Sequence, residues 1–272
     1  MENTGERHIP SLEIKDEAEY YNHLMHIATY RYALQFANNK QVLDYGCGSG
    51  YGSFMLSKVS DRITAIDISE ETLLYAKNTY KAENLSFKNL SELSDEKYDI
   101  ITAFQVIEHV RNSESLIRKL RSLLNPGGLL LVSTPDRKNR LFKLIQRPWN
   151  IFHYREFSDI ELKKTLQNYF ENVEILRIGS DSDLVLKEIA RTRKQRLISL
   201  PCTMIIYPDI LRVRLLSMQV HAFSMIKKIR NRDRSQKTYS IHHQDFNKAV
   251  FQKEIEISGR IKHSTDLFAI CS

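Results

Sequence analysis

Residues 42–52, VLDYGCGSGYG, join an apolar run to three glycines at alternate positions: Gly46, Gly48 and Gly50. Glycine lacks a Cβ atom, so the chain can turn tightly here and bring its backbone close to a ligand. The helix expected over residues 51–58 would point its free N–H groups at whatever the turn holds. The G-x-G-x-x-G fingerprint of dinucleotide sites would need glycine in place of Tyr51 or Ser53. The turn therefore predicts a nucleotide-type site of another kind.

An acidic residue follows at the interval that a ribose contact requires. Asp67 ends the apolar run 63–66 and lies 23 positions after Asp44 (67 − 44). In a doubly wound fold, an acid at about this interval accepts hydrogen bonds from the ribose hydroxyls, and such charge-assisted bonds are strong. The alternative is that Asp67 caps the helix over residues 70–80, but Ser69 is placed to do so. We therefore expect Asp67 to contact ribose.

Two further motifs complete the pattern. Residues 98–110 read YDIITAFQVIEHV, and residues 123–135 read LLNPGGLLLVSTP. With the glycine turn and Asp67, they resemble the class I S-adenosylmethionine (SAM) dependent methyltransferases in order and spacing. The resemblance implies a Rossmann-like, doubly wound α/β fold. Its seven-stranded sheet would have the order 3-2-1-4-5-7-6, with the last strand antiparallel.

The same resemblance implies a SAM site with S-adenosylhomocysteine (SAH) as the product. Gly46, Gly48 and Gly50 would approach the methionine part, and Asp44 would orient its ammonium group. Asp67 would bind the ribose, Ile68 would cover the adenine, and Asn89 and Leu90 would face the adenine edge. Gln105 would lie beside the sulfonium. Tyr30 and Arg31 would close over the cofactor, with Arg31 as a clamp for its carboxylate.

Two residues of the VIEH motif are candidates for activating the acceptor. Methyl transfer is an in-line displacement, in which holding the acceptor near the methyl carbon contributes ~7–11 kcal/mol. A hydroxyl acceptor also needs a base, and histidine has a suitable pKa. Gln105, Glu108 and His109 stand at i, i+3 and i+4, which predicts one shared helix face. The alternative is that Glu108 and His109 only anchor the helix to neighbouring loops.

Some methyltransferases with this helix bind a divalent metal, including small-RNA 2′-O-methyltransferases and ubiquinone-pathway O-methyltransferases. They add a later histidine, for which His153 in the segment NIFHYREF is the candidate. The RNA enzymes carry Glu at the first position of the motif, whereas this chain has the neutral Gln105. We therefore expect no metal, and we treat His153 as a candidate catalytic residue.

A narrower resemblance points to the acceptor. Residues 4–7, 30–33 and 133–135 and the segment FHYREF look like a bacterial subgroup associated with surface-polysaccharide or other glycan biosynthesis. It implies O-methylation of a glycan or small-molecule acceptor. The acceptor would be held by the N-terminal helix, the loop 136–154 and the segment that follows residue 178.

Alternating strand and helix patterns place these motifs in a chain of 272 residues. The strands are expected at 41–45, 62–67, 85–88, 98–104, 129–133, 173–178 and 267–271, and helices at 20–38 and 157–170. The last helix would be capped by Ser158. This map divides the chain into a helical lead-in (1–40), a SAM-binding core (41–178), a basic insertion or lid (179–265) and a final core strand (266–272).

The insertion holds the positive charge. Residues 187–234 contain twelve Lys or Arg and three acidic residues, a local net charge of +9. The whole chain carries +7, so the remainder carries −2. Basic residues beside apolar turns suggest contact with an anionic membrane surface, as in a lipid- or quinone-type O-methyltransferase. A path for nucleic-acid phosphates is another interpretation, and a solvated lid is a third.

A nucleic-acid methyltransferase is the rival class. Base N-methylating enzymes usually carry an N/D-P-P-Y/W run after the fourth strand, where this chain reads FQVI at 104–107. Nucleic acid is therefore the less favoured partner. The polar start MENTGERHIP and three widely spaced cysteines favour a cytoplasmic protein, peripheral to the membrane at most.

Overall fold

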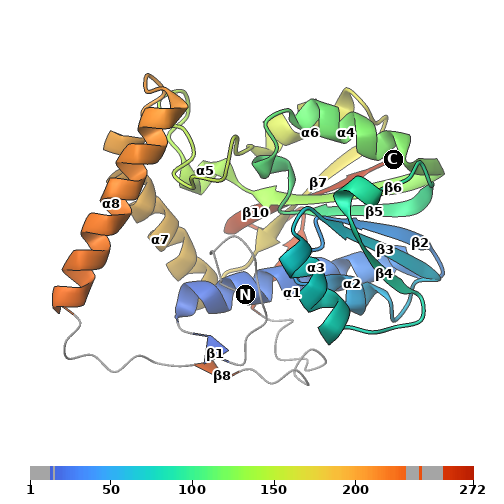
Figure 1. Cartoon of the computed structure of the whole chain (residues 1–272). Coiled ribbons are helices and arrows are strands. Elements are labelled where there is room, and N and C mark those ends of the chain that lie inside the picture. Colours follow the sequence, from blue (N-terminus) through green and yellow to red (C-terminus); the bar gives the residue numbers. More distant parts are fainter. Residues whose placement is uncertain (1–12, 15, 231–238, 241–253) are drawn as a thin grey trace.

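The computed structural model describes residues 13–14, 16–230, 239–240 and 254–272, so residues 4–7 of the subgroup resemblance lie outside it. A mixed sheet forms the centre and helices cover both of its faces (Figure 1). No helix within these ranges is both long and apolar enough to span a bilayer.

Eight strands form the central sheet in the order β4-β3-β2-β5-β6-β10-β7-β9. Their bounds in this order are Leu85–Asn89, Arg62–Asp67, Gln41–Tyr45, Tyr98–Phe104, Leu124–Pro135, Ser264–Cys271, Val173–Gly179 and Glu256–Ser258. The first five are parallel, and β10 pairs antiparallel with both β6 and β7. The expected order and the antiparallel last strand are confirmed. A separate pair, β1 (Glu13–Ile14) and β8 (Tyr239–Ser240), is also antiparallel.

The eighth strand was not predicted. β9 pairs with the edge of β7 and so draws part of the expected insertion into the sheet. β10 begins at Ser264, two residues before the expected boundary, because Ser264 already pairs with Gly179. Three residues are too short a run for the alternation that identifies strands in a sequence.

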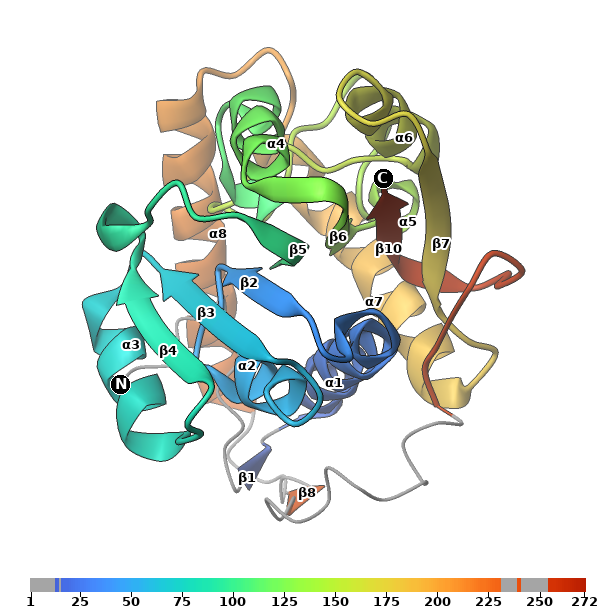
Figure 2. The same cartoon turned by 90° about the vertical axis from the view of Figure 1, so that its right-hand side faces the viewer.

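Helices cover the two faces of the sheet as two layers, seen above and below it in Figure 2. One hydrophobic core joins the sheet to α1 (Glu17–Ala37), α2 (Tyr51–Leu56), α3 (Glu70–Thr79) and α7 (Asp183–Ser199). The other joins it to α4 (Ser113–Ser122) and α6 (Asp159–Gln167). Ser69 and Ser158 cap α3 and α6 as expected, accepting hydrogen bonds from Thr72 N and Glu161 N.

The segment after β5 differs from the prediction. It forms a 3₁₀ turn, η2 (Ile107–His109), and not an α-helix, so Gln105, Glu108 and His109 do not share a helix face. Gln105 has φ 55°, a left-handed conformation that is uncommon for a residue other than glycine and prevents a helix from starting there. Two other short turns are η1 (Leu90–Glu92) and η3 (Leu200–Cys202).

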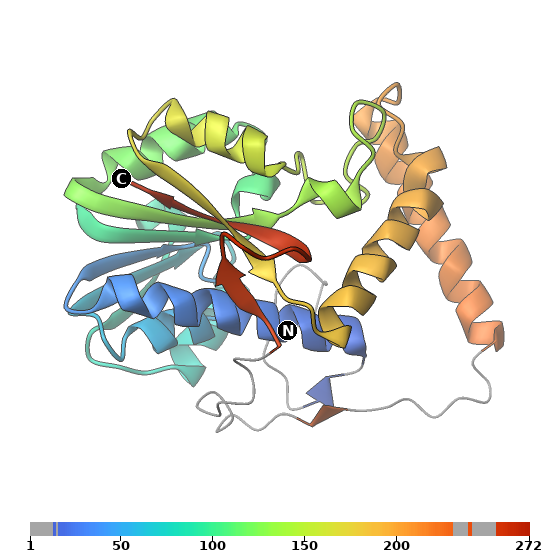
Figure 3. The same cartoon turned by 180° about the vertical axis from the view of Figure 1, so that it is seen from behind.

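The basic segment contributes two long helices. α7 buries Val185, Ile189 and Thr192, whereas α8 (Asp209–Arg230) stands apart from the sheet beside α7 (Figures 1 and 3). The short helix α5 (Arg137–Arg140) lies near their junction.

Candidate active site

A cavity of about 960 Å³ opens at the carboxyl ends of β2, β3 and β5. Ligands of open α/β sheets bind at this edge. The expected site residues that line the cavity are Tyr30, Gly46, Gly48, Asp67, Ile68, Leu90, Gln105 and His109.

The glycine turn and the acid after β3 are joined by hydrogen bonds. Gly48 has φ 53°, and its N–H donates to Asp67 Oδ2 over 3.0 Å. Ser69 N donates to Asp67 Oδ1 over 2.9 Å. Two backbone donors therefore fix the carboxylate, while the exposed Ile68 lies beside it in the cavity wall.

Asp44 lies behind the wall of the cavity and not in it. Its carboxylate is fully buried and accepts hydrogen bonds from Ser53 Oγ (2.6 Å), Thr102 Oγ1 (2.7 Å) and Tyr30 OH (3.1 Å). Burial raises the pKa of Asp44, and these three donors oppose the rise. Asp44 thus positions Tyr30, which lines the cavity, and its expected role in orienting an ammonium group stays a prediction.

Glu108 and His153 of the expected catalytic residues, and three other expected cofactor residues, also lie outside the cavity lining. The Asn89 side chain accepts from Ser91 N in a capping box with Glu92 at the start of η1. Gly50 has φ 87°, and a Cβ atom there would lie 2.7 Å from Ala76 Cβ, so the residue serves packing. Arg31 on α1 is half-buried, and burial lowers the pKa of its guanidinium.

Gln105 connects the cavity to the last strand. Its Nε2 donates to Asp266 Oδ1 over 3.2 Å and to Ser133 Oγ over 3.4 Å. Asp266 is buried, and its burial raises the pKa of the carboxyl to about 6. A left-handed, non-glycine residue at the end of a strand is a feature that clusters at functional sites.

Glu108, His109 and His153 meet beyond Gln105. Tyr154 N donates to Glu108 O over 2.8 Å, which holds the 150s loop against η2. The two histidine rings pack edge to face, with centroids 4.7 Å apart. His109 lines the cavity and its Nδ1 lies 3.3 Å from Phe152 O, so Nδ1 is the donor. The sequence grouped His153 with the VIEH motif, but it did not predict the edge-to-face ring contact, which depends on how the 150s loop folds.

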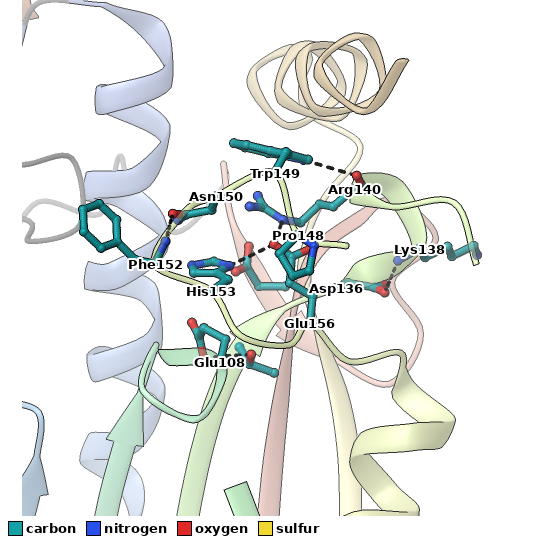
Figure 4. Close-up of polar contacts among 12 residues, drawn as sticks. Glu108, Asp136, Lys138, Arg140, Pro148, Trp149, Asn150, Phe152, His153 and Glu156 are labelled. Carbon is teal, nitrogen blue, oxygen red and sulfur yellow. Dashed lines mark hydrogen bonds and ion pairs between the residues drawn. The ribbon is translucent and has the colours of Figure 1, made fainter. Parts of the chain in front are cut away.

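Hydrogen bonds continue behind His153 (Figure 4). His153 Nδ1 lies 2.9 Å from Glu156 Oε1, which also accepts from Arg140 Nε over 3.0 Å. Burial would raise the pKa of Glu156, but Arg140 and His153 bring it below its ordinary value. A buried anionic glutamate therefore orients the His153 ring.

Glu108 has one unused acceptor. It is fully buried, Oε2 accepts from Thr134 Oγ1 over 2.9 Å, and Oε1 has no hydrogen-bond partner among the described residues. Burial raises the pKa of Glu108 to about 7, opposed by His153. Ligand atoms of Glu108, His109 and His153 all lie within 4.8 Å of one another. The donor set suits either a divalent cation or a protonated Glu108.

The sequence did not predict the residues at the end of the cavity that we call its far end, which is formed by α1, the segments 110–111 and 151–154, and the start of α8. Helix α1 adds His26, whose pKa burial lowers to about 4. Further unpredicted lining residues come from three segments that the topology brings together: Val110, Arg111, Ile151, Phe152, Tyr154, Asp209, Ile210, Arg212, Val213 and Arg214. Only the general location was foreseeable, since the loop 136–154 and the insertion were expected to hold an acceptor.

Known proteins resemble this chain over its core. A family model described as a methyltransferase domain matches residues 18–189. A probable S-adenosylmethionine-dependent methyltransferase of Mycolicibacterium smegmatis is 34% identical over 173 residues, 63% of this chain and 65% of that protein. A Mycobacterium tuberculosis protein of the same description is 34% identical, over 60% of this chain and 58% of its own length. The chain thus spans less than two thirds of these relatives.

More distant matches include a ubiquinone biosynthesis O-methyltransferase of Glaesserella parasuis, 32% identical over 55% of this chain and 67% of that protein. Among solved structures, magnesium protoporphyrin IX methyltransferase from Synechocystis with bound SAH matches with a TM-score of 0.48 at 18% identity, covering 62% of this chain and 83% of that one. A SAM-dependent methyltransferase from Mesorhizobium loti matches with a TM-score of 0.49 at 16% identity, covering 61% and 90%.

The family model covers more than half of the chain, and it spans the glycine turn, Asp67 and the VIEH segment. The chain belongs to the methyltransferase domain family, which confirms the class I SAM-dependent resemblance inferred from those motifs.

Proposed function

We propose that the protein uses SAM to methylate an oxygen atom of a glycan or small-molecule acceptor. One observation carries this proposal. The glycine turn, Asp67 and His109 all line the same cavity. Bound SAM would supply an electrophilic methyl group. The residues of the chain would bind it, orient the acceptor and accept the acceptor's proton.

The cofactor end is supported by the hydrogen bonds that fix Asp67. The Gly48 and Ser69 N–H groups hold the Asp67 carboxylate at the cavity wall, where it can accept from ribose hydroxyls. Ile68 and Leu90 offer apolar surface for the adenine, and Gln105 and His109 belong to the same lining.

His109 is the proposed base. Its Nδ1 donates to the Phe152 carbonyl, and in the neutral ring this leaves Nε2 as the basic nitrogen. His153 packs on His109 and is itself oriented by Glu156, so we assign His153 and Glu156 positioning roles. A buried, protonated Glu108 fits the same arrangement, since charged Glu108 would leave Oε1 uncompensated.

A metal-assisted reaction is the alternative that this cluster supports. Glu108, His109 and His153 would hold the cation, which would polarise the acceptor oxygen. We favour the metal-free reaction because this chain carries the neutral Gln105 at the position where related RNA enzymes carry a Glu ligand.

We further propose that the acceptor is presented at an anionic membrane surface. Exposed Ile205, Ile206 and Ile210 project near the start of α8, next to the exposed Arg214. Each basic residue near such a surface contributes about 1 kcal/mol. The wild type should sediment with phosphatidylglycerol vesicles but not with phosphatidylcholine vesicles. The variant Ile206→Asp should no longer sediment with phosphatidylglycerol vesicles. Equal sedimentation of this variant would contradict the proposal.

The experiment that tests the function is a transfer assay with methyl-labelled SAM and a panel of glycan, lipid-linked and RNA acceptors. We expect label to enter an alkali-stable methyl ether of a glycan-type acceptor. Label in RNA would replace the proposed acceptor class. Saturable SAH binding without label in any acceptor of the panel would contradict the proposed acceptor class but would leave the cofactor assignment intact.

A further inference from the structure

The far end of the cavity carries an excess of arginine side chains. Arg111 follows η2, and Arg212 and Arg214 stand on the first turns of α8. The acidic residue in this part of the lining is Asp209. Since Asp209 Oδ1 also accepts from Arg147 Nη1 over 2.6 Å, its charge is already shared with a fourth arginine.

Arg212 is the buried member of this group. Its side chain is 5% exposed, and Nη1 donates to the backbone oxygens of Pro148 (2.6 Å) and Asn150 (3.4 Å). Nε lies 3.5 Å from Asp209 Oδ1 and makes no hydrogen bond within the described part of the chain. Burial lowers the pKa of Arg212, and Asp209 opposes this only in part. A buried cation with an unused donor calls for an anion.

Arg111 and Arg214 can complete an anion site around it. Both are exposed, and the Arg111 guanidinium lies 5.3 Å from the ring centroid of Tyr154, another lining residue. Guanidinium groups bind phosphate and carboxylate through paired N–H donors. The lining between them is apolar, with Ile151, Phe152 and Val213.

We propose that Arg111, Arg212 and Arg214 bind an anionic group, a phosphate or a carboxylate, on the methyl acceptor. The inference rests on the proposed function and names its substrate class: an acceptor whose anion lies beside an apolar or ring-shaped part. The methylated oxygen would then lie between this anion and the glycine turn, within reach of His109.

The test uses SAH-saturated protein, so that the cofactor end is filled. Inorganic phosphate, glucose 1-phosphate and succinate are titrated in turn, by calorimetry at constant ionic strength. We expect saturable binding of at least one probe, and the tightest probe assigns the anion to the phosphate or the carboxylate class. Arg214→Ala and Arg111→Ala should each weaken binding about tenfold or more, because each removes a charged hydrogen-bond donor. Arg212 is tested in the same way by Arg212→Ala. If that variant fails to fold, Arg212→Lys replaces it, because lysine keeps the charge but lacks the planar donors.

The matched control is Lys194→Ala, which removes one positive charge from an exposed position of α7 outside the lining. It should bind the probes like the wild type. Equal weakening by Lys194→Ala, or unchanged binding in both arginine variants, would overturn the subsite. Weaker SAH binding in those variants would assign the arginines to the cofactor instead. If the wild type does not bind SAH at all, the proposed function fails and not this subsite alone.

Discussion

The Gly48 N–H donates to the Asp67 carboxylate across 3.0 Å and so joins the turn after β2 to the end of β3. The bond holds the acid at the cavity wall. Preorganisation of this kind lowers the ordering cost of binding. The glycine turn and Asp67 thus act as one structural unit, although 19 positions separate Gly48 and Asp67 in the sequence.

Two glycines of this turn should respond differently to substitution by alanine. Gly50→Ala would bring a Cβ atom within 2.7 Å of Ala76 and 2.8 Å of Phe87 at φ 87°, so we expect a loss of about 2–4 kcal/mol in unfolding free energy. Gly48→Ala, at φ 53° with no atom within 4 Å, should cost only about 1 kcal/mol. Urea denaturation measures both, and equal losses would contradict the packing role of Gly50.

His109→Ala should lower kcat about 10²-fold or more, because general-base catalysis contributes about 10²–10⁴-fold. The affinity for SAM should stay within about twofold of the wild type, since the Gly48 and Ser69 donors that fix Asp67 do not involve His109. His221→Ala, which removes an exposed histidine of α8, is the control. Unchanged turnover in His109→Ala would remove this residue from the mechanism.

Asp266 gives a pH-dependent prediction for stability. Burial raises its pKa to about 6 in the folded protein, above the ordinary value of 3.8. A raised folded-state pKa adds stability below pH 4 that is lost as the pH rises through about 6. The free energy of unfolding of Asp266→Asn, relative to that of the wild type, should therefore rise by about 1–3 kcal/mol from pH 4 to pH 8. Chemical denaturation at the two pH values decides this, and a pH-independent difference would contradict it.

Metal removal should leave the reaction intact. Dialysis against EDTA, followed by assay in metal-free buffer, should change neither turnover nor SAH affinity. The reason is that the neutral Gln105 stands where the related RNA enzymes carry a Glu ligand, so a cation here would lack one charged oxygen ligand. Turnover that falls after dialysis and returns with added Mg²⁺ or Mn²⁺ would assign Glu108, His109 and His153 to a cation.

The parts of the site that the sequence predicted depend on local conformation. The glycine turn, Asp67 and the Ser69 cap each follow from a strand end and the few residues after it. The burial of Asp44 behind the cavity wall was not predicted, because its hydroxyl partners Tyr30, Ser53 and Thr102 come from three separate elements.

Two other errors also arose from long-range structure. The left-handed Gln105 replaces the expected helix by a 3₁₀ turn, which separates the buried Glu108 from the cavity face of His109. Arg212 reaches the cavity only because α8 lies against the 148–150 loop. Helical spacing alone did not reveal either arrangement.

Calorimetric titration of SAH into the wild type and into Asp67→Ala tests the central claim most directly. The account predicts one saturable site in the wild type and no measurable binding in Asp67→Ala, because the ribose hydroxyls lose their charged acceptor. Thermal unfolding gives a second readout, since SAH at 100 times its Kd should stabilise only the wild type, by about 2.7 kcal/mol. Near-normal SAH affinity in Asp67→Ala, or no binding to the wild type, would contradict the account.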